Sequence, residues 1–437
     1  MGKRLLTLLL TAVILTSCGG GSHEESGLHF KSQSLINGKN YDFYFDYDDS
    51  YFDSPATTFN KPLMTYSFGL SIAADDSNTI TKFLTESGFG NFSYPKYYDE
   101  ETTPNGIGYT FASKEIGENN VIALTVRGSN YHREWISNLM VGETGDHEGF
   151  KNASTIVESD LMDYITTNGF DLENTKILLT GYSRGGGVAN LLANRLLKED
   201  FIAEERFYVY TFEAPASVAD ENVEECSNVF NILNSADPVP MIPPTAYGLT
   251  RCGTDIDIYN SSVDKLCKKF DKDLVLPEFT PLDGQYSKDT EIPSYIIGRI
   301  LKYEDDGSTH LSISDRAGYY NNLQSKITYL LSVFFEVPSS VLNAIMDDFS
   351  KRGSSGLITY FLSENGLYNY LEPFISGQVV YDEDTLKDAL ETLRKEVFGG
   401  AFNFVLVYVS NFSPLLRMIY MHTADVNYLL IKNYKGS

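Results

Sequence analysis

The stretch KILLTGYSRGGGVANLLANRL, residues 176–196, contains the pattern that decides the fold. Its start, residues 177–179, is a short apolar run typical of a strand buried on both faces, and residues 188–197 have the apolar spacing of a helix. Between them lies a G-x-S-x-G pattern centred on Ser183. At a strand-to-helix turn this pattern puts the serine on a sharp, strained bend that requires small neighbours. The stretch therefore predicts a nucleophilic Ser183 at the carboxyl end of a buried strand.

A G-x-S-x-G pattern on its own also occurs by chance, because Gly and Ser are common residues. The strand before it and the Ala- and Leu-rich helix after it are what favour a nucleophile here. The start of that helix also offers partial positive charge and N–H groups, which suit a developing oxyanion. Partners for Ser183 have to come from other parts of the chain.

The chain opens with MGKRLLTLLLTAVILTSC. Lys3 and Arg4 form a basic region, residues 5–15 an apolar one, and residues 15–18 resemble a bacterial lipobox in which Cys18 is acylated after cleavage. The apolar run is shorter than the ~20 residues that a membrane span requires. The opening therefore predicts an export signal rather than a membrane span.

We expect residues 1–17 to be a lipoprotein signal peptide and residues 18–27 a flexible Gly/Ser tether. The mature protein is then an exported bacterial lipoprotein, held at the cell envelope membrane by a lipid on Cys18. A plain secretory signal with an incidental cysteine is the alternative.

Charge and length limit the class of protein. The formal net charge is −25, and loss of Lys3 and Arg4 with the signal changes it to about −27 (−25 − 2). Such a chain is poorly suited to nucleic acid or to an anionic lipid surface, so no nucleic-acid partner is expected. The ~420 residues that remain suffice for one large domain with an insertion or for two domains. The oligomeric state is left open.

Three cysteines follow Cys18, namely Cys226, Cys252 and Cys267, so at most one disulfide forms among them. Their spacing is not that of a zinc site, and nothing around them supports catalysis. We interpret them as structural, with their pairing open, and expect no metal site.

A second informative stretch is VIALTVRGSNYHREWISNL, residues 121–139. Residues 121–126 predict a strand, and Arg127-Gly128-Ser129 turns off its end. In the α/β-hydrolase arrangement, one oxyanion donor is the main-chain N–H after the nucleophile, here that of Arg184, and the other comes from an earlier strand-end loop. Ser129 lies where that second donor is expected.

The run RGSNYHREWISNL resembles the R-G-[ST] oxyanion segment and the Trp-bearing lid of the class 3 (fungal-type) lipases. His147-Glu148-Gly149-Phe150 resembles the H-x-G-F element that precedes a long helix in that family. The runs YHREW, HEGF and GYSRGG together are closer still to bacterial lipase-like lipoproteins of the superfamily. The resemblance implies an α/β-hydrolase fold and hydrolysis of carboxylic esters.

The sequence departs from the fungal pattern around the serine and in the lid. Tyr182 and Arg184 replace the His and Leu usual there, which favours a different substrate preference. The segment between Ser129 and His147 is short for a mobile lid. Trp135, the only tryptophan, is interpreted either as a lid anchor over the acyl site or as a core residue.

Several other polar residues near these motifs have weaker claims to function. His132 and Glu134 are expected to be surface polar residues. His147 is expected to be structural, because it precedes the nucleophile whereas this fold places its base last. Glu213 ends a strand predicted for residues 207–212; it is a rival acid, but we expect a strand-end carboxylate of this kind to be solvated.

The acid is predicted to be Asp237, in the segment NSADPVP that follows a strand at residues 229–233. Pro238 and Pro240 restrict the backbone around this carboxylate, which suits the orientation of an imidazole. The segment also resembles the DPVPxxPP acid loop of class 3 lipases. The alternative is that Asp237 merely begins a turn.

Two histidines follow Asp237: His310, in a polar turn region, and His422, in IYMHTADVNYLL. The bacterial relatives carry a His followed closely by Tyr and an apolar helix, as Tyr428 follows here. This resemblance favours His422 as the base, with His310 as the alternative. The order Ser183, Asp237, His422 is the one that α/β-hydrolases use.

Between acid and base lies an insertion, residues 282–413, that we expect to form a helical cap over the catalytic mouth. Residues 28–281 and 414–437 would form the α/β-hydrolase core around a mostly parallel sheet. Apolar cap side chains could line an acyl groove, although ordinary core packing explains them as well. The predicted helices of the insertion cover residues 293–303, 319–337, 340–349, 357–371 and 384–397.

The sequence thus predicts a lipase or esterase that acts on acyl lipids through Ser183, Asp237 and His422 and needs no cofactor. One alternative is a non-catalytic lipid- or glycan-binding surface lipoprotein on a hydrolase scaffold. The other is a serine peptidase or acyltransferase. The family resemblance leaves triacylglycerol, phospholipid and acylated polysaccharide open as substrates.

Overall fold

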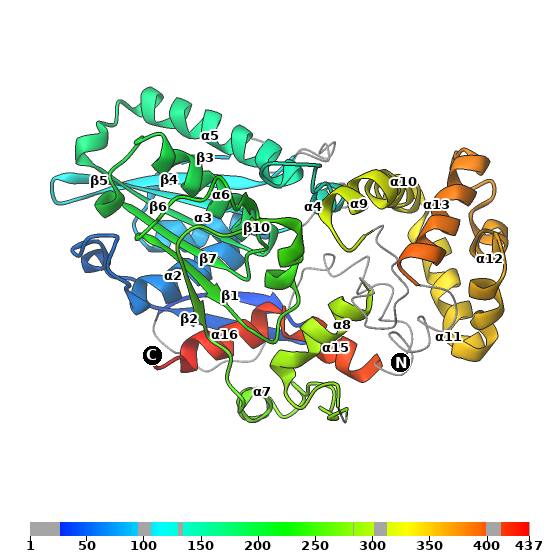
Figure 1. Ribbon diagram of the computed structural model, residues 1–437. Coiled ribbons are helices and arrows are strands. Elements are labelled where there is room, and N and C mark those ends of the chain that lie inside the picture. Colours follow the sequence, from blue (N-terminus) through cyan, green and yellow to red (C-terminus); the bar gives the residue numbers. More distant parts are fainter. Residues whose placement is uncertain are drawn as a thin grey trace. The chain divides into compact units, whose positions relative to one another are not determined.

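The chain divides into two compact units, which Figure 1 draws as ribbons. The computed structural model describes residues 27–94, 106–129, 134–282, 284–300, 313–398 and 412–436. Cys18 with the signal peptide, His132 and His310 lie outside the described residues. The sheet unit consists of the described residues of Leu15–Asn130, Gly145–Leu276 and Ile419–Ser437, and the helical unit of those of Tyr131–Thr144 and Pro277–Met418.

The sheet unit is built on a seven-stranded sheet in the order β11-β9-β7-β6-β5-β4-β3. The strands from β5 to β11 run parallel, and β4 and β3 continue the β5 edge in antiparallel fashion. This is the mostly parallel sheet of an α/β-hydrolase, so the predicted fold class is confirmed. The strand bounds are β3 (Gly90–Ser93), β4 (Tyr109–Ile116), β5 (Asn119–Val126), β6 (Thr175–Tyr182), β7 (Phe207–Phe212), β9 (Val229–Leu233) and β11 (Thr254–Asp257).

Helices cover both faces of this sheet, with α5 (Glu148–Asn168) and α6 (Arg184–Lys198) on one face and α2 (Lys61–Ala73) on the other (Figure 1). The unit also contains two small antiparallel strand pairs. Its remaining elements are β1 (Leu28–Gln33), β2 (Asn40–Phe45), β8 (Val218–Ala219), β10 (Leu249–Thr250), α3 (Ser77–Glu86), α7 (Val263–Phe270) and α16 (Ala424–Asn433).

Strand β6 shows why the central strands are mostly apolar. Ile177 and Leu179 point into the core that α5 and α6 share with the sheet. Thr180 points to the opposite face, where its hydroxyl donates to the Ser67 carbonyl of α2 at 3.2 Å. Because both faces are covered, successive side chains are buried in turn, as the apolar run predicted.

The helical unit has its own apolar core between α10, α11, α12 and α13. Leu330, Leu357 and Leu390 are among its buried side chains. The apolar residues of the insertion are therefore used largely in mutual packing. The helix bounds are α4 (Glu134–Asn138), α8 (Ile292–Ile300), α9 (Arg316–Tyr319), the π-helix η8 (Tyr320–Gln324), α10 (Ser325–Glu336), α11 (Ser339–Leu362), α12 (Gly366–Ile375), α13 (Glu383–Glu396) and α15 (Phe412–Tyr420), whose last residues belong to the sheet unit.

One predicted helix of the insertion is wrong. The single helix expected for residues 357–371 is divided, because α11 runs on to Leu362 and α12 starts only at Gly366. Asn365 between them has φ 54°, in the left-handed region that ends helices. A Cβ on Gly366 would lie 2.2 Å from the Tyr360 carbonyl oxygen, so the chain packs too closely there for any other residue.

Arg316 ties the segment after Ser129 to the first helices of the insertion. Its buried guanidinium donates to three main-chain carbonyls, from Nε to Gly142 at 2.9 Å and from Nη2 to Val141 at 2.7 Å and Thr144 at 3.0 Å. The sequence prediction had grouped this segment with residues 28–281. In the structure its described part belongs to the helical unit.

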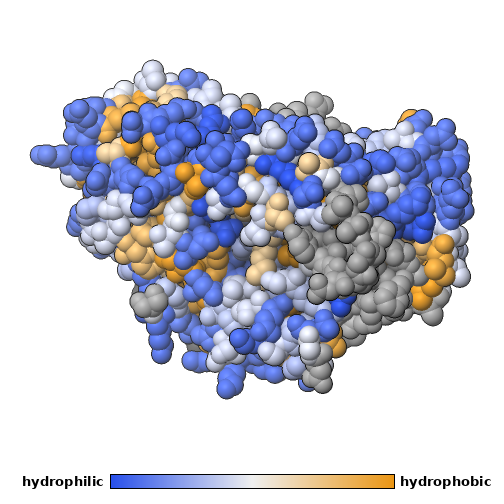
Figure 2. All heavy atoms as spheres, in the orientation of Figure 1, coloured by the Kyte–Doolittle hydropathy of each residue, from blue (hydrophilic) through white to orange (hydrophobic). Residues whose placement is uncertain are grey.

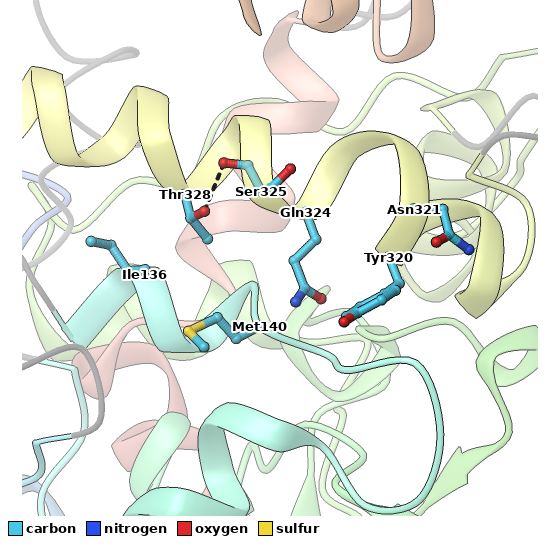
Figure 3. A pocket seen from close by; sticks show the side chains of 7 residues that line it. All are labelled: Ile136, Met140, Tyr320, Asn321, Gln324, Ser325 and Thr328. Carbon is cyan, nitrogen blue, oxygen red and sulfur yellow. Dashed lines mark hydrogen bonds between the residues drawn. The ribbon is translucent and has the colours of Figure 1, made fainter. Parts of the chain in front are cut away.

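The helical unit contains a cavity of about 470 Å³ (Figure 3). Ile136 and Met140 line one side. Tyr320, Asn321, Gln324, Ser325 and Thr328, from η8 and α10, line the other. Amide and hydroxyl groups make this lining mixed, unlike the aliphatic acyl groove considered from the sequence.

The surface of the protein is mainly hydrophilic on the face that Figure 2 shows. Smaller apolar patches lie between the hydrophilic side chains. Among the described residues, no single helix has the length and apolar composition for a membrane span. The pair Arg316–Glu336 and Ser339–Phe349, bent by 112°, meets the length and composition criteria as a pair.

Candidate active site

Ser183 lies on the sharp turn between β6 and α6, as predicted. Its φ of 56° and ψ of −125° are uncommon for a residue with a side chain. The turn is fixed on both sides, because the Ser183 N–H donates to the Phe212 carbonyl at 2.8 Å and its own carbonyl accepts from the Gly187 N–H at 3.0 Å. The hydroxyl makes no capping bond to the helix that follows.

Gly181 and Gly185 are required by close packing at this turn. A Cβ on Gly181 would lie 2.4 Å from the Gly185 carbonyl, and a Cβ on Gly185 would lie 2.4 Å from the Val126 carbonyl oxygen. The prediction that small residues flank the serine is therefore confirmed. The second contact also presses the turn against the end of β5.

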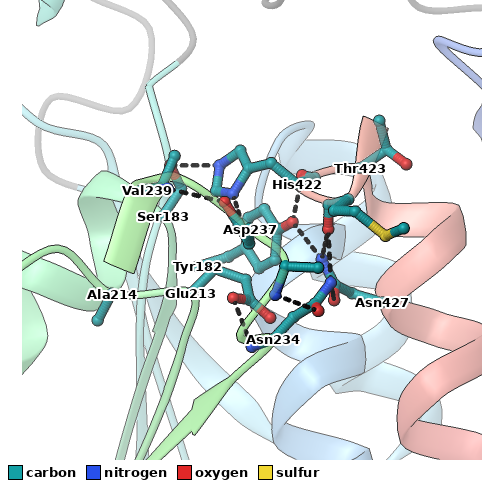
Figure 4. A network of polar contacts seen from close by, with 12 residues as sticks. Tyr182, Ser183, Glu213, Ala214, Asn234, Asp237, Val239, His422, Thr423 and Asn427 are labelled. Carbon is teal, nitrogen blue, oxygen red and sulfur yellow. Dashed lines mark hydrogen bonds and ion pairs between the residues drawn. The ribbon is translucent and has the colours of Figure 1, made fainter. Parts of the chain in front are cut away.

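Three side chains from distant parts of the chain form one hydrogen-bonded series at this turn (Figure 4). His422 Nε2 lies 2.9 Å from Ser183 Oγ, and His422 Nδ1 lies 2.6 Å from Asp237 Oδ2. The Asp237 side chain is 0% exposed and that of His422 is 23% exposed. An imidazole held this way can accept the serine proton at Nε2 while the buried carboxylate holds its Nδ1 side.

Main-chain groups fix the orientation of the Asp237 carboxylate. Its Oδ1 accepts from the Val239 N–H at 2.8 Å, which leaves Oδ2 directed at the imidazole. The Asp237 N–H in turn donates to the Asn234 carbonyl at 2.8 Å. The proline-containing turn thus holds the carboxylate in a defined position after β9.

Tyr182 holds the segment that carries His422. Its hydroxyl donates to the His422 main-chain carbonyl at 2.5 Å, and the two rings are stacked with centroids 5.2 Å apart. Asn427 Nδ2 donates to the same hydroxyl at 3.1 Å. Burial, followed by the charge of Asp237, raises the pKa of Tyr182 well above its usual value, so the hydroxyl keeps its proton.

The candidate oxyanion donors flank the serine. Arg184 is the first residue of α6, where main-chain N–H groups point out of the helix end. Its guanidinium is buried and donates to the Gly106 carbonyl at 3.0 Å. On the other side, a Cβ on Gly128 would lie 3.3 Å from the Tyr182 carbonyl oxygen, so the turn that carries Ser129 runs beside the end of β6.

The remaining predicted residues lie outside this series of hydrogen bonds. His147 is buried at the start of α5, where its Nδ1 accepts from the Phe150 N–H at 3.4 Å, in keeping with the structural role expected. Glu134 is fully buried, so its prediction as a surface residue is wrong; a lone charged residue in a short segment gives no periodic sign of burial. Trp135 is partly buried on α4, and its role as a lid anchor stays a prediction.

The expectation that Glu213 is solvated is also wrong. The residue is 1% exposed, and its Oε2 accepts from the Asn234 N–H at 3.0 Å. Burial and the neighbouring Asp237 carboxylate raise the pKa of Glu213 well above 4.5. One feature of the sequence indicated that Glu213 lies near the site. It is a charged residue directly after the apolar strand β7, at the edge of the sheet where Ser183 lies.

Cys226, Cys252 and Cys267 are buried free thiols. Among the described residues, no group of three or more His, Cys, Asp or Glu side chains is arranged to hold a metal ion. Tyr182, Asn234 and Asn427 were not predicted from the sequence in the positions they occupy around the triad. No spacing rule marks such residues, because their roles arise from contacts between distant segments.

Comparisons with known proteins agree with this geometry. Residues 123–247 match the sequence model of the family Lipase (class 3). The chain is 27% identical over 175 residues to secreted mono- and diacylglycerol lipase 1 of Fusarium solani, which covers 37% of this chain and 51% of that protein. It is 27% identical over 154 residues to a lipase of Rhizomucor miehei, which covers 32% of this chain and 42% of that protein.

The chain thus spans about half the length of these relatives. A solved structure of the Rhizomucor miehei triacylglyceride lipase is 20% identical with a TM-score of 0.38, over 46% of this chain and 80% of that one. The family match contains Ser129, Ser183 and Asp237 and ends before His422. Its segments are the ones that build the strained turn and the acid turn. The chain therefore has an α/β-hydrolase fold, and its residues 123–247 match the class 3 lipase family.

Proposed function

We propose that the protein is a serine ester hydrolase that cleaves carboxylic esters of acyl lipids. Ser183 is the nucleophile, His422 the general base, and Asp237 the acid that orients His422. The observation that carries the proposal is the pair of hydrogen bonds, 2.9 Å and 2.6 Å, that joins these side chains at a strained strand-to-helix turn.

The mechanism assigns a role to each partner in these two hydrogen bonds. His422 Nε2 accepts the Ser183 proton as Oγ attacks the ester carbonyl carbon. Asp237 accepts a hydrogen bond from His422 Nδ1–H and stabilises the imidazolium. The imidazolium then gives its proton to the leaving alkoxide. Water, deprotonated by the same imidazole, then attacks the acyl-serine. The imidazolium returns the proton to Ser183 Oγ as the C–O bond breaks and the carboxylic acid leaves.

Oxyanion stabilisation is assigned to the main-chain N–H groups of Ser129 and Arg184, with the Ser129 hydroxyl as a third donor. Ser129 follows the end of β5, and Arg184 is the first residue of α6. Loss of one such donor typically lowers kcat by about 10²–10³-fold. Support for acyl lipids as substrates comes from the family match and from relatives named as lipases.

The proposal is tested with the mature chain lacking the signal peptide and a p-nitrophenyl ester of a short fatty acid. Ser183→Ala is expected to lower the rate by about 10³-fold or more. Ser363→Ala, at an exposed position in the helical unit, serves as the matched control and is expected to keep the parent rate. A Ser183→Ala protein as active as its parent contradicts the assignment.

A substrate panel separates ester hydrolysis from peptidase activity. Matched p-nitrophenyl esters and p-nitroanilides of the same acyl group compare the two leaving groups directly. We expect turnover of the esters with little or none of the anilides. Anilide cleavage at a comparable rate would instead favour a peptidase.

We also propose that Cys18 is lipidated and anchors the protein to the cell envelope. The proposal is supported by the lipobox-like segment at residues 15–18 and the Gly/Ser tether after it. Metabolic labelling with an alkyne fatty acid is expected to tag the parent and not Cys18→Ser. Equal labelling of both proteins would refute the anchor.

A further inference from the structure

We propose that Glu213 is a positioning residue of the triad, a neutral carboxylic acid that donates its proton to Asp237. One negative charge, shared between the two carboxyl groups, then faces His422. This inference rests on the function proposed above and adds a second buried acid to it. Four observations carry it: the backbone at Glu213, its burial, its bond to Asn234 and its contact with Asp237.

The backbone directs the Glu213 side chain toward the triad at a cost in strain. Its φ of 47° lies in the left-handed region, which a residue with a long side chain rarely adopts. The Glu213 N–H donates to the Ile232 carbonyl at 3.0 Å, which continues the pairing of β7 with β9 past the end of β7. The side chain is thereby turned into the protein beside the acid turn.

Asn234 links Glu213 to both Asp237 and the His422 segment (Figure 4). Its N–H donates to Glu213 Oε2 at 3.0 Å, and its carbonyl accepts from the Asp237 N–H at 2.8 Å. Its side-chain amide donates to the Met421 carbonyl at 3.0 Å, one residue before His422. Glu213 is therefore part of the framework that sets the distance between Asp237 and the imidazole.

The charges around Glu213 favour its neutral form. The two carboxyl groups, 1% and 0% exposed, interact in the same buried region, and two such groups cannot both ionise without strong repulsion. The other titratable groups that act on Glu213 are Asp257 and, across the site, Tyr182, which are acids as well. Burial, followed by the Asp237 charge, raises the pKa of Glu213 and so assigns the proton to it.

Two basic groups on neighbouring segments, Arg251 and His422, bind partners other than Glu213. Arg251 donates to the Ala214 carbonyl at 3.1 Å and forms an ion pair with Asp255 at 2.9 Å. His422 bonds to Asp237, which stands between it and the second acid. Ionisation of Glu213 would therefore place two carboxylates in contact beside the imidazole, without a proton between them.

The test compares Glu213→Gln with Glu213→Ala in the mature chain, with the p-nitrophenyl ester as substrate. A glutamine keeps an N–H donor for Asp237 and an acceptor for Asn234 but cannot ionise. It is expected to keep kcat at pH 7 within about threefold of the parent. Alanine removes the donor and is expected to lower kcat by about 10–100-fold, with KM nearly unchanged.

The pH profile gives a readout that a merely structural role would not move. Ionisation of Glu213 is expected to lower the parent's kcat on the alkaline side, and Glu213→Gln is expected to lose this decline. Glu158→Gln, a partly buried acid on α5 that pairs with Arg195, is the control and should keep the parent profile. A decline retained in Glu213→Gln overturns the proposal, as does a glutamine variant as impaired as the alanine one.

Infrared difference spectroscopy tests the protonation state without relying on activity or on a folded alanine variant. At pH 7 the parent is expected to show the C=O band of a protonated carboxylic acid, and Glu213→Gln is expected to lack it. Identical spectra overturn the proposal. If Ser183→Ala lowers activity while the Glu213 variants match the parent, only this inference fails; if Ser183→Ala matches the parent, the proposed function fails.

Discussion

Two residues other than glycine that have positive φ directly follow two neighbouring parallel strands. Ser183 after β6 has φ 56° and Glu213 after β7 has φ 47°. Conformations of this kind cost on the order of 1–3 kcal/mol each for residues other than Gly. Both side chains are directed into the same network of polar contacts (Figure 4). The strain is thus located where side-chain direction matters for the proposed chemistry.

The neutral state of Glu213 gives protein stability a defined dependence on pH. Its pKa in the folded protein is raised above the ordinary value of 4.5, so the folded state keeps a proton that the unfolded state releases. This contribution to stability is fully present below the unfolded pKa. It is lost, by up to about 1.4 kcal/mol per pH unit, as the pH rises toward the folded pKa.

Glu213→Gln cannot titrate, so its free energy of unfolding should rise relative to that of the parent as the pH rises above the ordinary pKa of 4.5. Denaturant unfolding of both proteins at several pH values measures this difference directly. Glu158→Gln gives the comparison for another buried acid in the same unit. A constant difference between Glu213→Gln and the parent would mean that Glu213 is ionised in the folded protein.

Residues marked by local motifs could be predicted from sequence, and residues placed by distant contacts could not. Ser183 and Asp237 were predicted because a glycine pattern and a proline-restricted turn surround them. His422 came from a family resemblance, since no local pattern separates it from His310. The burial of Glu213 depends on the register of β7 with β9 and on Asn234, which a single strand pattern does not contain.

At the scale of elements, the apolar central strands were the most predictable. β7 and β9 have the bounds expected from their apolar runs, because burial on both faces favours apolar side chains at most of their positions. β11 was not predicted, since its sequence TDID is polar and its side chains are largely exposed at the sheet edge. The division of α11 from α12 depends on a left-handed Asn365 and one close contact, neither of which has a periodic signal.

The bonds of Arg316 predict how the segment that it holds responds to mutation. Arg316→Met keeps the length of the side chain and removes three bonds to main-chain carbonyls, so we expect faster amide exchange in residues 134–144. The free energy of local opening of this segment is expected to fall by about 2–3 kcal/mol, because hydrogen bonds to charged groups are stronger than those between neutral groups. Hydrogen exchange with mass spectrometry measures it peptide by peptide.

Arg352→Met is the matched control for this experiment. Arg352 is exposed on α11 and pairs with Asp348 on the same helix, so its loss should leave exchange in residues 134–144 unchanged. Equal protection of residues 134–144 in the parent and in Arg316→Met would show that other contacts hold the segment.

At the scale of the molecule, the chain leaves the sheet unit between the acid and the base of the proposed triad and returns to it before His422. The sheet unit is interrupted after the acid turn, and the return is at Ile419. The return is anchored by α16, where the Tyr428 ring stacks on Phe43 with centroids 4.5 Å apart. The sequence predicted an insertion between acid and base, and its role as a cap over the catalytic mouth stays a prediction.

Composition and length predicted the fold class and the absence of a nucleic-acid partner, but few of the contacts between distant segments. The net charge of −25 and the apolar strand pattern were enough to favour an α/β protein with no nucleic-acid partner. The inclusion of residues 134–144 in the helical unit could not be predicted, because it depends on carbonyl contacts of Arg316 far along the chain. Such contacts leave no mark in local hydrophobic spacing.

The reactivity of Ser183 is the central claim, and a fluorophosphonate probe tests it most directly, because such probes react with serines activated by a neighbouring base. The mature chain is treated with the probe, and the modified residue is located by peptide mass spectrometry. We expect one adduct per chain, on the peptide that contains Ser183, and almost none in His422→Gln. An unlabelled parent protein, an adduct at another residue, or equal labelling of His422→Gln would contradict the account.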